Sequence, residues 1–263
     1  MAPEANRDWV AQLCRALEAK GRRPVREKIP RLRPIGELAA LGERLMDEAE
    51  SVAEWPARRR AVLFRDALMI ALLAYRPVRL KNLAMMRLGL HLVKASGSWQ
   101  ILFAAHETKT HVRYEATVPS ALAARLERYL DIYRPVLLCG KRLRDGANKV
   151  LVSERETPIY PELDAVWVSE VGTQLEQAAL GCRIVKHTQA AFGRIVSPHL
   201  FRDSAATSIA VDNPKHIGDA SLVLGHAEHR MTEKHYNHAR SLEASRRLAE
   251  TLMRFARSAD RKG

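Results

Sequence analysis

Fifteen residues near the C-terminal end, GHAEHRMTEKHYNHA (225–239), contain four histidines and one tyrosine. Three interpretations are open. The two HxxH pairs, His226 with His229 and His235 with His238, have a spacing that could bind a metal from one helical face. Tyr236 could instead be a nucleophile assisted by His226, or the segment could be a polar surface helix.

The nucleophile interpretation requires a bend in the chain. Ten residues of continuous helix separate His226 from Tyr236 and would turn the chain by about 1000°, so the two side chains would not align. Gly225 lies where such a bend could begin, and Thr232 is suited to cap a following helix.

A second group is HLFR (199–202), in which His199 and Arg202 are three residues apart. On a helix that spacing brings both side chains to one face, where they could touch one ligand. The same spacing is common on solvated helices, so this pair by itself does not indicate a ligand site. Other segments must support that interpretation.

Five segments in order resemble the tyrosine recombinases, also called the phage integrase family. They are RPVRLKNLAMMRL with Arg79, HETKTHVRYEATVP with Lys109, HLFR with His199 and Arg202, LGH with His226, and MTEKHY with Tyr236. The resemblance covers roughly residues 51–240. It implies that Tyr236 attacks a scissile DNA phosphate, which the other five residues surround.

The chemistry of these side chains suits attack on a phosphodiester. Charge grows on the phosphate oxygens during attack, and Arg79 and Arg202 carry planar donor forks that stay charged and bind two oxygens each. A tyrosine hydroxyl has a pKa of about 10, so Tyr236 needs a base or a strongly cationic site.

The remaining three residues have candidate roles in proton transfer and binding. His199 is the candidate base, and His226 would donate to a nonbridging oxygen. Lys109 is the candidate acid for the departing 5′ oxygen. The product would be a covalent phosphotyrosine that retains the energy of the broken linkage. This chemistry requires no metal, ATP or other cofactor.

The sequence departs from the family pattern at several positions. Pro77 replaces a glycine, Asn82 replaces a carboxylate that often follows the arginine by three residues, and Asp203 replaces a basic residue. Arg76 is therefore an alternative to Arg79. The interval from His226 to Tyr236 is one residue longer than in many relatives, which makes His235 the neighbour of the nucleophile.

Composition predicts a polyanionic partner. The 263 residues include 43 Lys and Arg against 30 Asp and Glu, a formal charge of +13, and this excess favours nucleic acid first and an anionic membrane surface second. No apolar run reaches the 18 residues of a membrane span, and no secretory signal is apparent. We therefore expect a cytoplasmic protein that binds double-stranded DNA, and the resemblance implies self-association on DNA as a tetramer.

The hydrophobic pattern predicts a mainly helical α+β fold with one small antiparallel sheet. Helical spacing covers 5–20, 35–50, 57–75 and 119–133, and the two β-prone runs around HETKT predict a hairpin that displays Lys109. Residues 1–50 form a predicted N-terminal segment with a basic linker at 21–34, and 51–263 form the predicted catalytic domain. A C-terminal helix packs on its own core or docks into a neighbouring protomer.

The function predicted from these features is site-specific DNA recombination or integration. Type IB topoisomerases share the active-site resemblance, so DNA relaxation is the nearest alternative. A binding-only relative and a zinc-linked structural protein are further alternatives. The presence of all six residues favours an enzyme, because DNA binding by itself has no use for a placed tyrosine.

Overall fold

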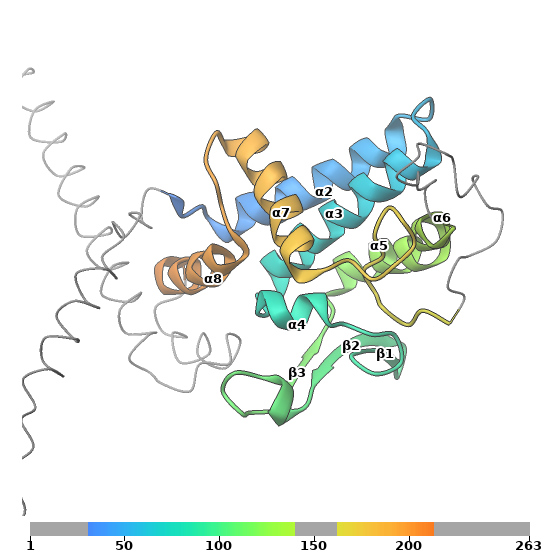
Figure 1. The fold of residues 1–263 in the computed structure, drawn as a ribbon. Coiled ribbons are helices and arrows are strands. Elements are labelled where there is room, and N and C mark those ends of the chain that lie inside the picture. The colour runs from blue at the N-terminus through green and yellow to red at the C-terminus, as the bar shows by residue number, and fades with distance from the viewer. Residues whose placement is uncertain (1–30, 140–161, 213–263) are drawn as a thin grey trace, which may run out of the picture. The chain divides into compact units, whose positions relative to one another are not determined.

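The computed structural model describes residues 31–139 and 162–212, with side chains up to 209. This part of the chain is mainly helical and contains one three-stranded antiparallel sheet, as the sequence predicts (Figure 1). The longer helices are α2 (Ile35–Ser51), α3 (Ala57–Tyr75), α5 (Ser120–Arg128), α7 (Gln177–Phe192) and α8 (Pro198–Asp212). The shorter helical elements are α4 (Leu80–Ala84), η2 (Ala105–Glu107), η3 (Tyr129–Tyr133) and α6 (Arg134–Leu138).

Helices α2 and α3 lie side by side and form the largest helix pair of the described chain (Figure 1). Their close approach depends on Gly42. A Cβ atom at that position would lie 2.7 Å from Cβ of Ala71 and 2.9 Å from the carbonyl oxygen of Ala67. No side chain larger than hydrogen fits there without displacing the helices.

Helix α3 is the central element of the core. Every residue from Phe64 to Ala74 is buried, so the later turns of this predicted helix are enclosed by the core on all sides. The helix contacts α2, α5, α6, η3, α7 and α8. On one side, the ring of Phe64 stacks on that of Tyr133, with ring centroids 4.3 Å apart.

One charged group is built into this core. The Asp66 carboxylate is fully buried and accepts hydrogen bonds from Arg65 Nη2 at 2.7 Å, Arg183 Nε at 2.6 Å and His187 Nε2 at 3.0 Å. Burial by itself would raise the pKa of Asp66. The hydrogen bond from His187 and the charges of Arg65 and Arg183 outweigh it, so the pKa is lowered. The cluster joins α3 to α7.

The sheet follows α4 in the sequence and has the order β1 (Leu92–Ala95), β2 (Ser98–Phe103), β3 (Tyr114–Thr117). A tight turn joins β1 to β2, with positive φ at Ser96 (49°) and Gly97 (78°), as a two-residue hairpin requires. Strands β2 and β3 pair antiparallel, with Phe103 opposite Tyr114. The predicted hairpin around HETKT is therefore confirmed.

Other predicted elements have mixed outcomes. The helices at 35–50, 57–75 and 119–133 are confirmed, the last as α5 continued by the π-helical turn η3. The predicted helix at 5–20, most of the linker at 21–34 and the C-terminal helix lie outside the described residues. Residues of α2 fall almost wholly within the predicted segment 1–50, and the division between 1–50 and 51–263 stays a prediction. Among the described helices, none has the length and apolar character needed to cross a bilayer.

Candidate functional site

The candidate site is organised around α4, a helix of only five residues that directly follows Arg79. So short a helix has little stability of its own, and its position depends on tertiary contacts. Trp167 Nε1 donates to the Leu83 carbonyl at 2.9 Å, and Gln174 Nε2 donates to the Ala84 carbonyl at 3.0 Å. Both donors come from the segment that precedes α7, so this segment fixes the C-terminal end of α4.

The N-terminal side of α4 is fixed by Arg202 of α8. Arg202 is only 7% exposed, and its Nη1 donates to the Pro77 carbonyl at 2.5 Å. Pro77 lies two residues before Arg79, so this hydrogen bond brings together two of the predicted site residues from segments far apart in the sequence. The rigid φ of proline suits a main-chain oxygen that must stay in place.

The two arginines are close enough for their charges to act on each other. Burial, reinforced by the charge of Arg79, lowers the pKa of Arg202 from 12.5 to about 10. Burial also lowers the pKa of Arg79. With a pKa of about 10, Arg202 still carries its full charge at neutral pH. Two adjacent cations are repulsive by themselves and are favourable around an anion.

Arg79 and its alternative Arg76 differ in their partners. The Arg76 guanidinium donates to the main-chain oxygens of Thr117 and Tyr75, each at 3.0 Å. Within residues 31–139 and 162–209 the Arg79 guanidinium makes no hydrogen bond or ion pair. Arg79 therefore has its donors available for a ligand, which favours it over Arg76; its assignment to the site stays a prediction.

The β2–β3 hairpin contributes Tyr114, which lies next to the connecting loop, to the same region. Tyr114, the first residue of β3, packs its ring 6.1 Å from that of Phe103. Burial raises the pKa of Tyr114, while the charges of Arg76 and Arg202 act in the opposite direction. Tyr114 therefore lies within electrostatic reach of Arg202 and keeps its hydroxyl proton at neutral pH. In the sequence, Tyr114 is distinguished only by its place in a β-prone run, so nothing in the pattern marks it as a site residue.

Lys109 is displayed by the loop between β2 and β3, as predicted. Its side chain is exposed, and within the described residues it makes no hydrogen bond or ion pair. Thr108 anchors the chain beside it, since the Thr108 hydroxyl accepts from the Val112 N–H at 3.1 Å. Lys109 thus extends from a loop whose base is fixed.

His199 and Arg202 lie on α8, which begins at Pro198. His199 is exposed and Arg202 is buried against the segment before α4. His226 and Tyr236 lie outside the described residues, as do His229, His235 and His238. The described structure therefore brings Arg79, Arg202 and Tyr114 of β3 together. The roles of all six predicted site residues stay predictions.

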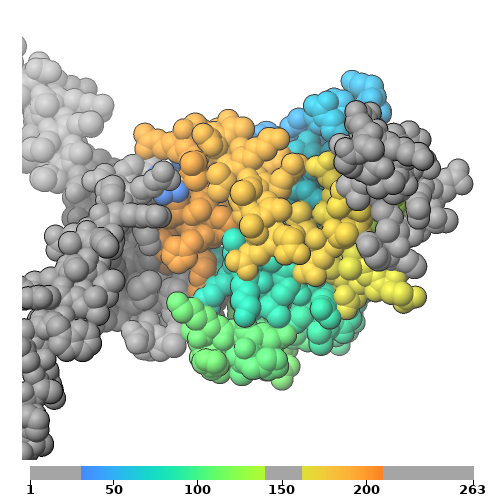
Figure 2. Space-filling model, viewed as in Figure 1, coloured from blue at the N-terminus to red at the C-terminus, as the bar shows by residue number. Residues whose placement is uncertain are grey.

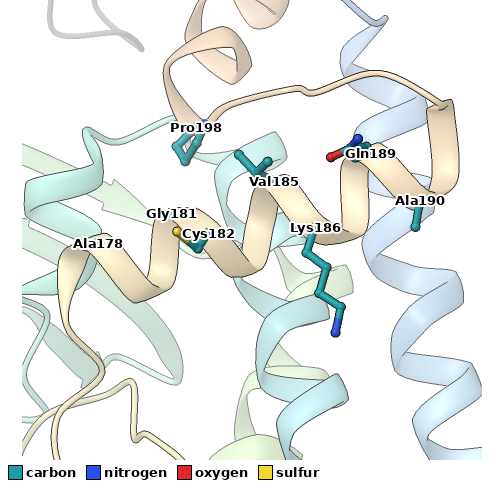
Figure 3. Close-up of a pocket in the computed structure, with 8 residues that line it drawn as sticks. All are labelled: Ala178, Gly181, Cys182, Val185, Lys186, Gln189, Ala190 and Pro198. Atoms are coloured by element: carbon teal, nitrogen blue, oxygen red, sulfur yellow. The ribbon is translucent and has the colours of Figure 1, made fainter.

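The part of the chain that is described has no cluster of metal ligands, and one of its grooves lies outside this region. No group of three or more His, Cys, Asp or Glu side chains there could bind a metal. A shallow groove of about 700 Å³ runs along α7 instead (Figure 3). Seven of its lining residues come from α7, with Pro198 facing them, and none is a predicted site residue. In Figure 2, α7 covers much of the visible face of the described chain.

Comparison with known proteins identifies the fold. No protein-family model and no curated protein matches the sequence. Among solved structures, a XerH site-specific recombinase in a post-cleavage complex with palindromic difH substrate matches with a TM-score of 0.55 and 20% identity. That match covers 81% of this chain and 52% of XerH. The XerA recombinase matches with a TM-score of 0.50 and 17% identity, over 79% of this chain and 61% of XerA.

The chain therefore spans about half of XerH and somewhat more of XerA. At these identities the likeness concerns the fold. The α4 segment, the three-stranded sheet and α8 occur in the order that the sequence resemblance requires. The described chain has the mainly helical fold, with one small antiparallel sheet, of the tyrosine-recombinase catalytic domain.

Proposed function

We propose that this protein is a site-specific DNA recombinase that cuts and rejoins double-stranded DNA through Tyr236. The observation that carries the proposal is the Arg79–Arg202 pair. These two cations lie within electrostatic reach of each other, and Arg202 is buried. Burial and the charge of Arg79 lower the pKa of Arg202 despite the opposing charge of Asp203, and a DNA phosphate beside both guanidiniums would favour their charged forms.

The proposed reaction is balanced without a cofactor. The Tyr236 hydroxyl oxygen forms a bond to phosphorus while its proton passes to His199. The bond from phosphorus to the 5′ oxygen breaks, and Lys109 supplies the proton that makes the leaving group a 5′ hydroxyl. Arg79, Arg202 and His226 donate hydrogen bonds to the nonbridging oxygens. Attack by a 5′ hydroxyl of another strand reverses the step and restores the tyrosine.

The net charge of +13 supports DNA as the partner. The XerH recombinase structure that this chain resembles in fold is a complex with difH substrate, so DNA is the ligand to test. Recombination joins two duplexes, so we further propose that several copies of the chain assemble on DNA. The proposed site of action is the cytoplasm.

The test is capture of the covalent intermediate. The protein and its Tyr236→Phe variant are incubated in EDTA with a pool of duplexes of random sequence, each carrying a nick. Cleavage near the nick releases a short fragment, which prevents rejoining and traps the adduct. We expect a protein–DNA band on a denaturing gel for the unaltered chain and none for the variant. Sequencing the attached DNA then identifies the preferred site.

Two other results would redirect the proposal. DNA binding without any adduct would indicate a binding-only protein. An adduct accompanied by relaxation of supercoiled plasmid, with no exchange of partners between two marked duplexes, would indicate DNA relaxation of the type IB kind.

A further inference from the structure

A partly buried hydrogen-bond network lies next to Lys109 and is not used by the proposed reaction. We propose that His91, Glu107 and Asn82 form a brace that positions Lys109 relative to Arg79, so that all three are positioning residues for proton donation to the leaving oxygen. This inference rests on the proposed function. It concerns residues in the loop between β2 and β3 and in the segment that includes α4.

Glu107 is the centre of the brace. One carboxylate oxygen, Oε1, accepts from His91 Nε2 at 2.9 Å, and the other, Oε2, accepts from the Ala104 N–H at 2.8 Å. The main-chain oxygen of Glu107 accepts from Asn82 Nδ2 at 3.2 Å. The carboxylate and the main-chain oxygen of Glu107 therefore both accept hydrogen bonds. Glu107 lies only two positions before Lys109 in the sequence. A side chain with so many fixed partners has little freedom to move.

The tautomer of His91 follows from the hydrogen-bond partners of its two ring nitrogens. The Arg87 N–H donates to His91 Nδ1 at 3.1 Å, so Nδ1 is the acceptor. Nε2 consequently carries the proton, which it donates to Glu107. His91 is only 3% exposed, and its ring centroid lies 5.2 Å from that of Phe103. The histidine is thus fixed on both sides.

Asn82 connects the brace to the arginine segment. It lies in α4, three residues after Arg79, and is only 5% exposed. Its amide also lies 3.9 Å from Met85 Sδ. A glutamate or aspartate here could not donate to the Glu107 carbonyl, whereas the asparagine amide can. The departure from the family pattern at this position therefore has a structural role in this chain.

Thr108 continues the brace toward Lys109. Its hydroxyl lies within hydrogen-bond distance of the carbonyls of Ala105 (3.1 Å) and Val112 (2.8 Å) and accepts from the Val112 N–H. It is 8% exposed, while Lys109 next to it is exposed. The loop is fixed up to the residue before the lysine. Proton donation depends steeply on position, since a displacement of about 1 Å can cost roughly 100-fold in rate.

The experiment separates positioning of the acid from other defects. Cleavage is measured on two DNA substrates with the sequence recovered from the covalent adducts. One contains the natural 5′ bridging oxygen, and the other contains sulfur at that position. A thiolate leaves readily without a proton, because thiols are far stronger acids than alcohols. Loss of the acid therefore slows the oxygen substrate and not the sulfur substrate.

The variants are Glu107→Gln and Asn82→Ala, and Lys109→Ala is the reference for loss of the acid. Glu107→Gln keeps the size of the side chain but leaves one acceptor oxygen for two donors, His91 Nε2–H and the Ala104 N–H. The matched control is Glu115→Gln, an exposed glutamate of the same hairpin that pairs with Arg113. Arg79→Ala is the reference for a defect that sulfur does not correct. Unfolding midpoints of all variants show that they are folded.

We expect Glu107→Gln and Asn82→Ala to cleave the oxygen substrate about 100-fold more slowly than the unaltered chain. On the sulfur substrate both should regain a rate within a few-fold of the unaltered chain, as Lys109→Ala should. Glu115→Gln should match the unaltered chain on both. If Glu107→Gln and Asn82→Ala are slow on both substrates, or normal on both, the brace does not position the acid and the inference is overturned.

Failure of the proposed function gives a different pattern. If the unaltered chain forms no adduct with either substrate, the proposed function fails and the inference fails with it. If the unaltered chain cleaves both but sulfur does not restore Lys109→Ala, Lys109 is not the acid. The cleavage chemistry then stands, and the brace inference is overturned.

Discussion

Two groups of buried positive charge in this protein are built in opposite ways. In the core, Arg65, Arg183 and His187 surround the single carboxylate of Asp66, and each donates a hydrogen bond to it. Beside α4, Arg202 is buried near a second cation, Arg79, and donates to a main-chain oxygen. The first group contains its own counterion. In the second, the like charge of Arg79 affects the pKa of Arg202 more strongly than the Asp203 carboxylate does.

The difference separates charges used for folding from charges available for binding. A buried cation with a carboxylate partner is compensated within the chain, so removing the carboxylate exposes the full cost of the buried charge. Two adjacent cations are compensated best by a ligand, so their contribution is realised when an anion binds. Substitutions in the two groups should therefore affect different measurements.

The largest expected effect is on stability, from Asp66→Asn. This change keeps the shape of the side chain and leaves Arg65, which is 1% exposed, without a negative partner. We expect the free energy of unfolding to fall by about 3–5 kcal/mol, measured by urea unfolding and tryptophan fluorescence. Asp131→Asn, at an exposed aspartate, is the control and should change it by less than about 0.5 kcal/mol. A small effect of Asp66→Asn would remove the distinction between the groups.

The next effect is on catalysis, from Arg79→Ala. Because the Arg79 side chain makes no hydrogen bond in the described chain, stability should change by less than about 0.5 kcal/mol. Formation of the covalent adduct should slow by roughly 10²–10³-fold, or about 2.7–4 kcal/mol. Lys81→Ala removes the same charge from an exposed position of α4 and is the control. Equal losses for both variants would show that Arg79 contributes only general attraction to DNA.

A smaller effect tests the packing of the scaffold, through Gly42→Ala. The added methyl would meet Cβ of Ala71 at 2.7 Å, so α2 and α3 must separate. We expect a loss of about 1–3 kcal/mol in the free energy of unfolding. Gly36→Ala, in the same helix with no atom within 4 Å of the new methyl, should be neutral or stabilising. If Gly42→Ala is as stable as the unaltered chain, the close approach of α2 and α3 at Gly42 is contradicted.

The smallest expected effect is a pH dependence at the hairpin. The hydrogen bond from His91 is the main cause that lowers the pKa of Glu107 below 4.5. A carboxyl group whose pKa is lowered by folding stabilises the protein above its unfolded pKa, and this contribution disappears as the pH falls through the lowered value. Unfolding midpoints measured from pH 6 to pH 3 should therefore fall more steeply for the unaltered chain than for Glu107→Gln. Parallel curves would contradict the pairing.

Local patterns were sufficient to predict most elements. The 57–75 helix follows from an apolar sequence on all faces, and the hairpin from two β-prone runs around a polar turn. The observed start of α8 at Pro198 agrees with the preference of proline for the first turn of a helix. These features depend on neighbouring residues, so they are readable from the sequence.

The sequence could not predict how the site is held together. The hydrogen bond from Arg202 to the Pro77 carbonyl and that from Asn82 to the Glu107 carbonyl use main-chain acceptors, which every residue possesses. No pattern of residue types marks which carbonyl will be used. The three donors around Asp66 have the same character, because they come from adjacent and distant positions that meet only after α7 packs on α3.

The sequence by itself determined the types and order of the candidate site residues, the excess of positive charge and the boundaries of the main helices. These depend on side-chain chemistry and on the short-range periodicity of helices and strands. Only the tertiary structure decided that Arg79 lies near Arg202, that Arg76 is occupied by main-chain oxygens, and that Asn82 is tied to the loop of Lys109. Those contacts depend on which distant segments pack together, and packing is a property of the whole folded core.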